Sequence, residues 1–159
     1  MPPSSLGAGT LVLSLAILTA VVFLVPSVTC DLTCRDENGD PVDWFIIYKL
    51  PHLRHHPDAL VREGIGYFYM DARRPEFSLS RKNLTLADHA IAHTLGGVYE
   101  NADNPDVGYV LYNDQIPGGG WSEKFGHTKG ALALDSQTGW WLIHSLPHFP
   151  PKAADGYSL

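Results

Sequence analysis

The stretch GHTKGALALDSQTGWWLIHSL, residues 126–146, decides the fold because it holds two strand patterns on either side of a turn. Small and apolar residues over 126–134 predict one strand, and the aromatic and β-branched run over 140–146 predicts a second. The polar segment 135–139 between them predicts a turn, so we expect the stretch to fold as a β-hairpin.

The hairpin carries a histidine and a lysine two positions apart. Side chains two apart in a strand point to the same face, so His127 and Lys129 are expected to project together. Gly126 and Gly130 bracket the pair, and their missing side chains would let a bulky ligand approach the backbone. Lysine neutralises a phosphate oxygen, and histidine attacks phosphorus or moves a proton. The pair suits phosphoryl transfer without a metal, although a solvated strand face shows the same spacing.

Strand and helix patterns alternate in the residues before the hairpin. The apolar and aromatic run 42–50 predicts a strand buried on both faces. A capping-box pattern at Thr85–Asp88, followed by apolar residues at helical spacing, predicts an amphipathic helix over 85–100. The remaining predictions are strands over 65–70 and 107–112 and loops over 52–64 and 116–120. We therefore expect an α/β fold, a mixed β-sheet of five strands with a helix packed on one face.

The first 30 residues form a separate segment without Asp, Glu, Lys or Arg. The apolar run Leu11–Val25 has the length of a signal-peptide core and is short for a membrane span of about 20 residues. Pro26 and small residues up to Cys30 end this run. We interpret residues 1–30 as a signal peptide that is cleaved near Cys30, with an uncleaved anchor as the alternative.

Two further features agree with a secretory compartment. Cys30 and Cys34 are the cysteines of the chain, so cleavage after Cys30 would leave Cys34 without a partner, which is unusual where disulfides form. The sequon at Asn83 predicts a glycosylation site.

The net charge of the chain makes a nucleic-acid partner dependent on pH. The formal charge of −6 opposes a polyanion at neutral pH. All eight histidines follow residue 30, and their full protonation would change the charge to +2 before any carboxylate is neutralised. An ordinary histidine titrates near pH ~6.5, so most of this change would be complete at about pH 5. The chain would repel DNA at pH 7 and tolerate it in an acidic compartment, unless the histidines titrate without forming a patch.

Beyond these patterns, five runs lie in order over about residues 32–157: LTC at 32–34, PVDWFIIYKLP at 41–51, LYND at 111–114, GHTKG at 126–130 and WLIHSLPHFPP at 141–151. With these runs the chain resembles the deoxyribonuclease II family, the acid nucleases of lysosomes, whose fold is related to phospholipase D.

The resemblance implies a chain of two similar halves, each supplying one His-x-Lys to an active site where the halves meet. One histidine would attack phosphorus and the other would protonate the leaving oxygen, which cuts DNA to 3′-phosphate ends at acid pH without a metal or another cofactor. His127 and Lys129 match the first His-x-Lys and would be the catalytic residues. Residues 31–159 would then be the amino-terminal half of a phospholipase D-like pseudodimer.

The sequence also departs from the family pattern. The phospholipase D pattern places an Asp five residues after the Lys, where this chain has Leu134, with Asp135 one position later, so that role is not carried over. A second His-x-Lys and a partner for Cys34 are absent from the sequence, so we expect a truncated form or an incomplete gene model. The nuclease would be complete only with a second half or a second copy. The alternatives are a truncated inactive fragment and a secreted nucleic-acid-binding domain.

Four further predictions concern individual residues. Asn113 follows a strand and is either a phosphate ligand or a turn residue, while His144 is expected to be structural. The loop histidines have the wrong spacing for a zinc site, so we expect them to be solvated and expect no metal; they are His52, His55 and His56. A missing partner half should leave an apolar face, for which the candidates are Trp121, Phe125, Trp140 and Trp141.

The predicted partners are DNA and the second half or a second copy of the chain. The predicted location is the lysosome or the cell exterior, and no membrane attachment is expected after signal cleavage.

Overall fold

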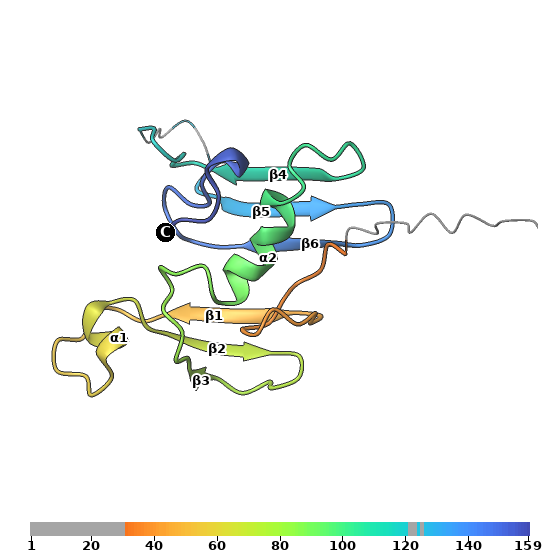
Figure 1. Cartoon of the computed structure of the whole chain (residues 1–159). Coiled ribbons are helices and arrows are strands. Elements are labelled where there is room, and N and C mark those ends of the chain that lie inside the picture. The colour runs from red at the N-terminus through yellow and green to blue at the C-terminus, as the bar shows by residue number, and fades with distance from the viewer. Residues whose placement is uncertain (1–30, 121–123, 125) are drawn as a thin grey trace, which may run out of the picture.

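The computed structural model describes residues 31–120, 124 and 126–159 as two small antiparallel sheets with short helices around them (Figure 1). The predicted signal peptide lies outside these residues. The first sheet has the order β1-β2-β3, formed by Phe45–Lys49, Tyr67–Asp71 and Ser78–Leu79. The second has the order β4-β5-β6, formed by Gly108–Asn113, Lys129–Leu134 and Gly139–Ile143. The helices are α1 (Ala59–Glu63), α2 (Ala90–Tyr99) and the 3-10 turn η1 (Ala153–Asp155).

The expected α/β class is confirmed, but the expectation of one five-stranded sheet is wrong. Among the described residues, no hydrogen-bonded ladder joins β1 of the first sheet to β6 of the second. Strand β3, which pairs with β2 through Phe68↔Leu79, has no counterpart in the sequence prediction because two residues carry too little periodicity.

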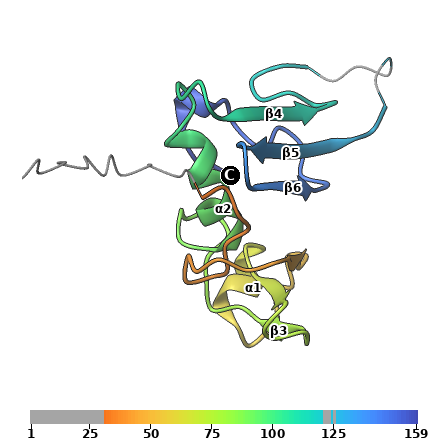
Figure 2. The same ribbon diagram turned by 90° about the vertical axis from the view of Figure 1, so that its right-hand side faces the viewer.

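Helix α2 lies over one face of both sheets and joins them through a shared core (Figures 1 and 2). Ile91, Leu95 and Val98 are buried in this core, as the helical spacing predicted. Their partners come from both sheets and from the segments around them: Leu32, Tyr67, Tyr69, Leu84, Ala90, Ala131, Ala133, Trp140 and Phe149.

Helix α2 begins at Ala90, later than the predicted residue 85. The predicted capping box does not form, because the Thr85 hydroxyl donates to Asn83 Oδ1 at 2.8 Å. Asp88 instead pairs with Lys82 and with His93. Local hydrogen bonds of this kind compete with helix initiation, which accounts for the shorter helix.

Strand β1 is covered on one face only, so the prediction that it is buried on both faces is wrong. Phe45 and Ile47 pack against the core under α2, whereas Ile46 and Tyr48 are 48% and 61% exposed. The face that carries these two side chains is therefore open to solvent. One face of the strand is thus packed and the other is exposed, although apolar side chains occur on both faces.

The predicted loop over 52–64 contains the short helix α1. Asp58 caps it by accepting a hydrogen bond from Val61 N at 3.2 Å, and Gly64 ends it in the left-handed region at φ 73°. An Asp at the N-cap and a Gly past the end are typical helix boundaries.

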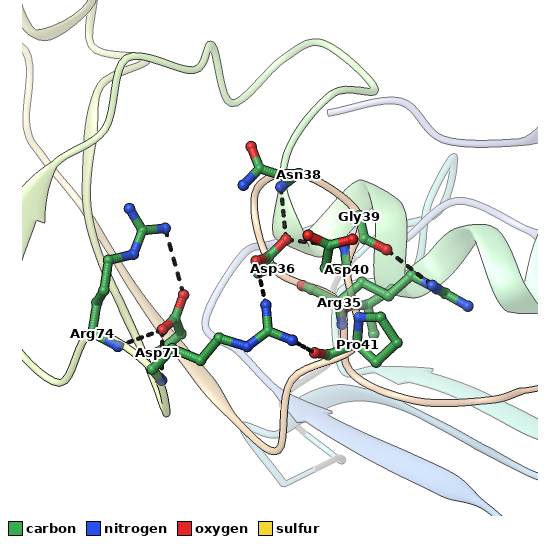
Figure 3. A network of polar contacts seen from close by, with 10 residues as sticks. Arg35, Asp36, Asn38, Gly39, Asp40, Pro41, Asp71 and Arg74 are labelled. Atoms are coloured by element: carbon green, nitrogen blue, oxygen red, sulfur yellow. Dashed lines mark hydrogen bonds and ion pairs between the residues drawn. The ribbon is translucent and has the colours of Figure 1, made fainter.

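A polar network fixes the segment before β1 to the end of β2 (Figure 3). Buried Asp36 accepts hydrogen bonds from Asn38 N at 2.8 Å and Asp40 N at 3.0 Å, which closes a tight turn. Its second oxygen accepts from Arg73 Nη1 at 3.2 Å. Asp71 Oδ1 in turn accepts from Arg74 N at 2.7 Å. The network positions the stretch that contains Cys34, whose carbonyl oxygen accepts from Val42 N at 2.9 Å.

Strands β5 and β6 confirm the predicted hairpin, although both are shorter than predicted. Asp135 closes the turn by accepting hydrogen bonds from Gln137 N at 2.7 Å and Thr138 N at 2.6 Å. Its carboxylate is therefore a turn residue of the hairpin. None of the helices in the described part of the chain is long and apolar enough to cross a bilayer.

Candidate active site

Asp114 holds the two residues of the His-x-Lys pair together. Its Oδ2 lies 2.7 Å from His127 Nδ1, and its Oδ1 accepts a hydrogen bond from Lys129 Nζ. The carboxylate also forms an ion pair with Lys129, and with His127 when that imidazole is protonated. His127 and Lys129 thus converge on one carboxylate.

The sequence suggested that His127 and Lys129 converge because they lie on one face of a strand, but the structure shows that the pairing of β4 with β5 brings them to Asp114. The last paired residues of β4 and β5 are Asn113 and Lys129, and beyond them Asp114 N donates to Thr128 O at 3.3 Å. This pairing sets Asp114 opposite Thr128, the residue between the histidine and the lysine. The predicted strand over 126–134 begins only at Lys129, because a bond from Thr128 N to Gly126 O at 2.8 Å bends the chain at His127.

Burial and charge differ sharply across this cluster. The side chain of Lys129 is 2% exposed and that of Asp114 is 10% exposed, whereas that of His127 is 82% exposed. A buried ammonium needs a paired carboxylate, which Asp114 supplies. The hydrogen bond from Lys129 lowers the pKa of Asp114, and the bond from His127 acts in the same direction, so Asp114 stays ionised in mild acid.

The arrangement leaves one imidazole nitrogen for chemistry. With Nδ1 of His127 directed to the Asp114 carboxylate, Nε2 is the ring nitrogen that a substrate can reach. A carboxylate in this position fixes the tautomer and orients the ring. A phosphate could reach the exposed ring directly, whereas Lys129 Nζ is covered and bonded to Asp114. His127 can therefore act as a nucleophile or a proton carrier, and the charge of Lys129 lies buried beneath it, next to Asp114.

The two glycines beside the pair differ in the space around them. A Cβ at Gly126 would meet nothing within 4 Å, which fits the predicted open approach. A Cβ at Gly130 would lie 2.2 Å from the Tyr112 hydroxyl oxygen and 2.6 Å from Leu142 O. The side chain of Tyr112 fills the space above Gly130, so the prediction of ligand access there is wrong.

Asn113 is used by the protein itself. Its Nδ2 donates to Phe149 O at 2.7 Å and to Leu146 O at 3.2 Å, and its Oδ1 accepts from Gln115 N at 2.7 Å. These bonds hold the segment after β6 against the end of β4. A phosphate ligand at Asn113 would have to replace one of them, and that role stays a prediction.

His144 lies beside the site, directly after strand β6. Its backbone N donates to Lys129 O at 3.2 Å, and its Nδ1 accepts from Leu146 N at 3.2 Å. Burial, together with the charge of Lys129, lowers the pKa of His144 to about 4. Its buried Nε2 has no hydrogen-bond partner among the described residues. The hydrogen bond at Nδ1 joins His144 to the backbone of its own chain, as expected for the structural histidine that the sequence predicted.

The remaining predicted site residues lie away from this cluster. Asn83 is half-buried in a turn that Thr85 closes, and its glycosylation stays a prediction. Cys34 is half-buried and free in the described part of the chain, and burial raises the pKa of its thiol. No group of three or more His, Cys, Asp or Glu side chains in residues 31–120, 124 and 126–159 is arranged to hold a metal ion.

Sequence reasoning missed Asp114. The signal was present in the run LYND, but the position after a predicted strand drew attention to the Asn of that run and not to the Asp. A buried lysine requires an acidic partner, and only the register of β4 against β5 shows that Asp114 is the one within reach.

Comparison with known proteins gives the same family as the sequence motifs. The sequence profile of the deoxyribonuclease II family matches residues 33–159. Plancitoxin-1 from Acanthaster planci is 41% identical over 148 residues, which are 92% of this chain and 40% of that protein. Deoxyribonuclease-2-alpha from Bos taurus is 41% identical over 145 residues, which are 89% of this chain and 38% of that protein. Cell death-related nuclease 6 from Caenorhabditis elegans is 38% identical over 134 residues, which are 83% of this chain and 35% of that protein.

The chain therefore belongs to the deoxyribonuclease II family. It spans about two fifths of the length of the curated relatives that it matches.

Proposed function

We propose that this protein is an acid endonuclease that hydrolyses DNA phosphodiester bonds, with His127 as one of two catalytic imidazoles. Membership of the deoxyribonuclease II family supports a DNA substrate. The observation that carries the proposal is the Asp114 carboxylate, which binds Nδ1 of His127 and Nζ of Lys129 and leaves Nε2 open.

The proposed reaction has two steps. Nε2 of one histidine attacks phosphorus to form an N–P bond, the P–O5′ bond breaks, and the second histidine gives its proton to the leaving 5′ oxygen. The second histidine then takes a proton from water, whose oxygen attacks phosphorus and breaks the N–P bond. The products are a 3′-phosphate and a 5′-hydroxyl, and both histidines regain their starting protonation states. No divalent metal takes part.

The second imidazole has to come from outside this sequence, which contains one His-x-Lys. We propose that it is supplied by a second, similar half or by a second copy of the chain, which would make residues 31–159 one half of a phospholipase D-like pseudodimer. The site would then lie between the halves. We place the protein in the secretory pathway, in the lysosome or outside the cell.

Plasmid cleavage at pH 5 in the presence of EDTA tests the proposal. Nicked products with 3′-phosphate ends are expected, either from the chain alone or after a second His-x-Lys half is added, and His127→Ala should abolish cleavage. The outer-loop variant His52→Ala is the matched control and should keep full activity. Cleavage that requires a divalent metal, or that persists in His127→Ala, would exclude the proposed mechanism.

The same assay separates the alternatives. A chain that binds DNA at pH 5 without cutting it, even with the second half present, would be a nucleic-acid-binding domain. A chain that neither binds nor cuts would be an inactive fragment.

A further inference from the structure

Strands β1 and β6 face one another across a slot that runs along both of them. Two cavities of about 430 Å³ and 580 Å³ lie end to end between the strands and share Phe45, Leu142 and Ile143 in their linings. Together they extend along residues 43–49 of the first sheet and 139–146 of the second. We call this space the β1–β6 slot. It separates the two sheets that α2 joins.

The two strands present free backbone groups to the slot. Ala72 N donates to Trp44 O, and Leu50 N donates to Gly66 O, so the even-numbered residues of β1 direct their backbone groups toward β2. The odd-numbered residues therefore direct theirs toward the slot. The bond from His144 N to Lys129 O sets the same alternation on β6. The slot-facing residues are Phe45, Ile47, Lys49, Gly139, Trp141 and Ile143, and no backbone hydrogen bond from these residues into the slot is found in the described part of the chain.

The slot is covered on one side and open on the other, as is a strand position in a sheet that packs on one face only. Its floor, on the α2 side, is formed by Leu84, Ile91 and Thr94. On the opposite side Ile46 and Ile143 are exposed. A strand placed here would bury one set of alternate side chains against α2 and align the other set with the exposed apolar face.

The direction and length of the slot fit one extended segment. Figure 1 shows β1 and β6 running in the same direction on either side of it. From residue 43 to residue 49, at ~3.3 Å per residue, the slot is about 20 Å long, which suits a strand of six or seven residues. Unpaired edges that face each other in this way are templates for strand addition.

From these observations we propose that the β1–β6 slot receives an extended strand from a polypeptide segment outside residues 31–159, which joins the two sheets into one. A second copy of the chain cannot readily supply it, because each described strand already pairs within its own sheet and an inserted strand must pair on both sides. The relatives carry the required material, since the matched part is about two fifths of their length. The inference is independent of the nuclease chemistry.

Hydrogen exchange of the full chain, read residue by residue by NMR, tests the proposal. The probes are overlapping 12-residue peptides that cover the part of plancitoxin-1 that this chain does not match. One peptide is expected to slow exchange of the slot-facing amides at least about tenfold. Ile46 and Leu142, which pair within their own sheets, should change little. The same peptide should slow the reaction of Cys34, which lines one end of the slot, with a thiol reagent.

Proline variants distinguish insertion from surface binding. Ile143→Pro removes an N–H that faces the slot and should weaken binding of the peptide at least tenfold, because one ladder bond and its geometry are lost. Tyr109→Pro removes an N–H on the outer edge of β4 and should bind like the parent chain. If Ile143→Pro does not fold, a peptide N-methylated at alternate positions gives the same test on the unmodified protein.

Three outcomes would overturn the proposal. The first is that none of the peptides protects the slot-facing amides. The second is that these amides are already protected in the isolated monomer, so that β1 and β6 pair directly. The third is that protection appears only as the chain dimerises, which would place a second copy in the slot.

Discussion

At the scale of single residues, Asp114 links a buried cation to an exposed imidazole. Lys129 has almost no access to solvent, so its charge acts on Asp114 and, through that carboxylate, on His127. The phosphate clamp expected from the His-x-Lys spacing is therefore set back from the surface. Of the three side chains, His127 is the one exposed to solvent.

Replacement of Asp114 by asparagine tests this linkage. The amide leaves Lys129 without an anion and no longer selects the His127 tautomer. The rate of DNA cleavage by the chain together with a second His-x-Lys half should therefore fall by a factor on the order of 10²–10⁴. The melting temperature should also fall. Asp135→Asn is the control, because Asp135 serves the hairpin turn, and it should lower stability while cleavage is retained. Full activity in Asp114→Asn would remove this residue from the site.

Two of the eight histidines have lowered pKa values, which reduces their share of the acid-dependent charge that the composition predicted. Burial lowers the pKa of His89, and burial with the Lys129 charge lowers that of His144 to about 4. If both stay neutral, protonation of the other six ends at a formal charge of zero before any carboxylate is neutralised. Attraction to DNA at about pH 5 then depends on where the remaining charges lie.

The same two histidines predict how stability changes with pH. A histidine whose folded pKa lies below its ordinary value of 6.5 binds protons more readily in the unfolded chain, so stability falls as pH drops from about 6.5 to about 4. The lowered pKa of Asp114 adds a further loss below its ordinary value of 3.8. Urea titrations between pH 7 and pH 4 should show the first loss, and His144→Asn should reduce its slope. A stability that is flat over this range would contradict the assignment.

At the scale of elements, Gly130 is required by the packing of Tyr112 across β5. A Cβ at position 130 would overlap the Tyr112 side chain and also Leu142 O, and the second clash is with backbone that cannot rotate away. Gly130→Ala should therefore lower the free energy of unfolding by about 1–3 kcal/mol. Gly126→Ala is the matched control, since its Cβ meets open space, and thermal melts of the two variants should separate clearly.

The turn around Asp36 makes a second prediction at this scale. Asp36→Ala leaves the amides of Asn38 and Asp40 and the Arg73 guanidinium without their acceptor, which should cost about 1–3 kcal/mol. Asp40→Ala changes an exposed carboxylate in the same turn and should be nearly neutral. Equal urea midpoints for the two variants would show that the network of Figure 3 contributes little.

At the scale of the whole molecule, one face of both sheets is apolar and uncovered. Trp141 is 63% exposed there, with Ile143 on the same strand and Ile46 and Tyr48 on β1. Of the residues predicted for such a face, Trp140 is buried, while Trp121 and Phe125 lie outside the described residues. Exposed apolar side chains that gather on one face favour association.

We expect the isolated chain to associate through this face. Light scattering should show dimers or larger species whose proportion rises with concentration, and Trp141→Lys should reduce it. Leu86→Lys changes an equally exposed apolar side chain that lies just before α2 and serves as the control. A monodisperse monomer at high concentration would contradict the prediction.

Elements with local signals could be predicted from the order of the amino acids. The hairpin over 126–146 followed from turn residues between two apolar runs, and Ile91, Leu95 and Val98 followed from helical spacing. Both signals lie between residues that are close together in the chain, so the amino-acid sequence contains them without knowledge of distant partners. The family motifs likewise led from GHTKG to His127 and Lys129.

Features that depend on pairing between distant segments became visible only in the folded chain. The register of β4 on β5 brought Asp114 to His127 and Lys129, and burial turned His144 into a base that stays neutral in mild acid. The separation of β1 from β6 replaced one expected sheet by two. Strand register and burial arise from contacts across the chain, and a local pattern of residues contains no information about which distant partner satisfies a charge or a backbone edge.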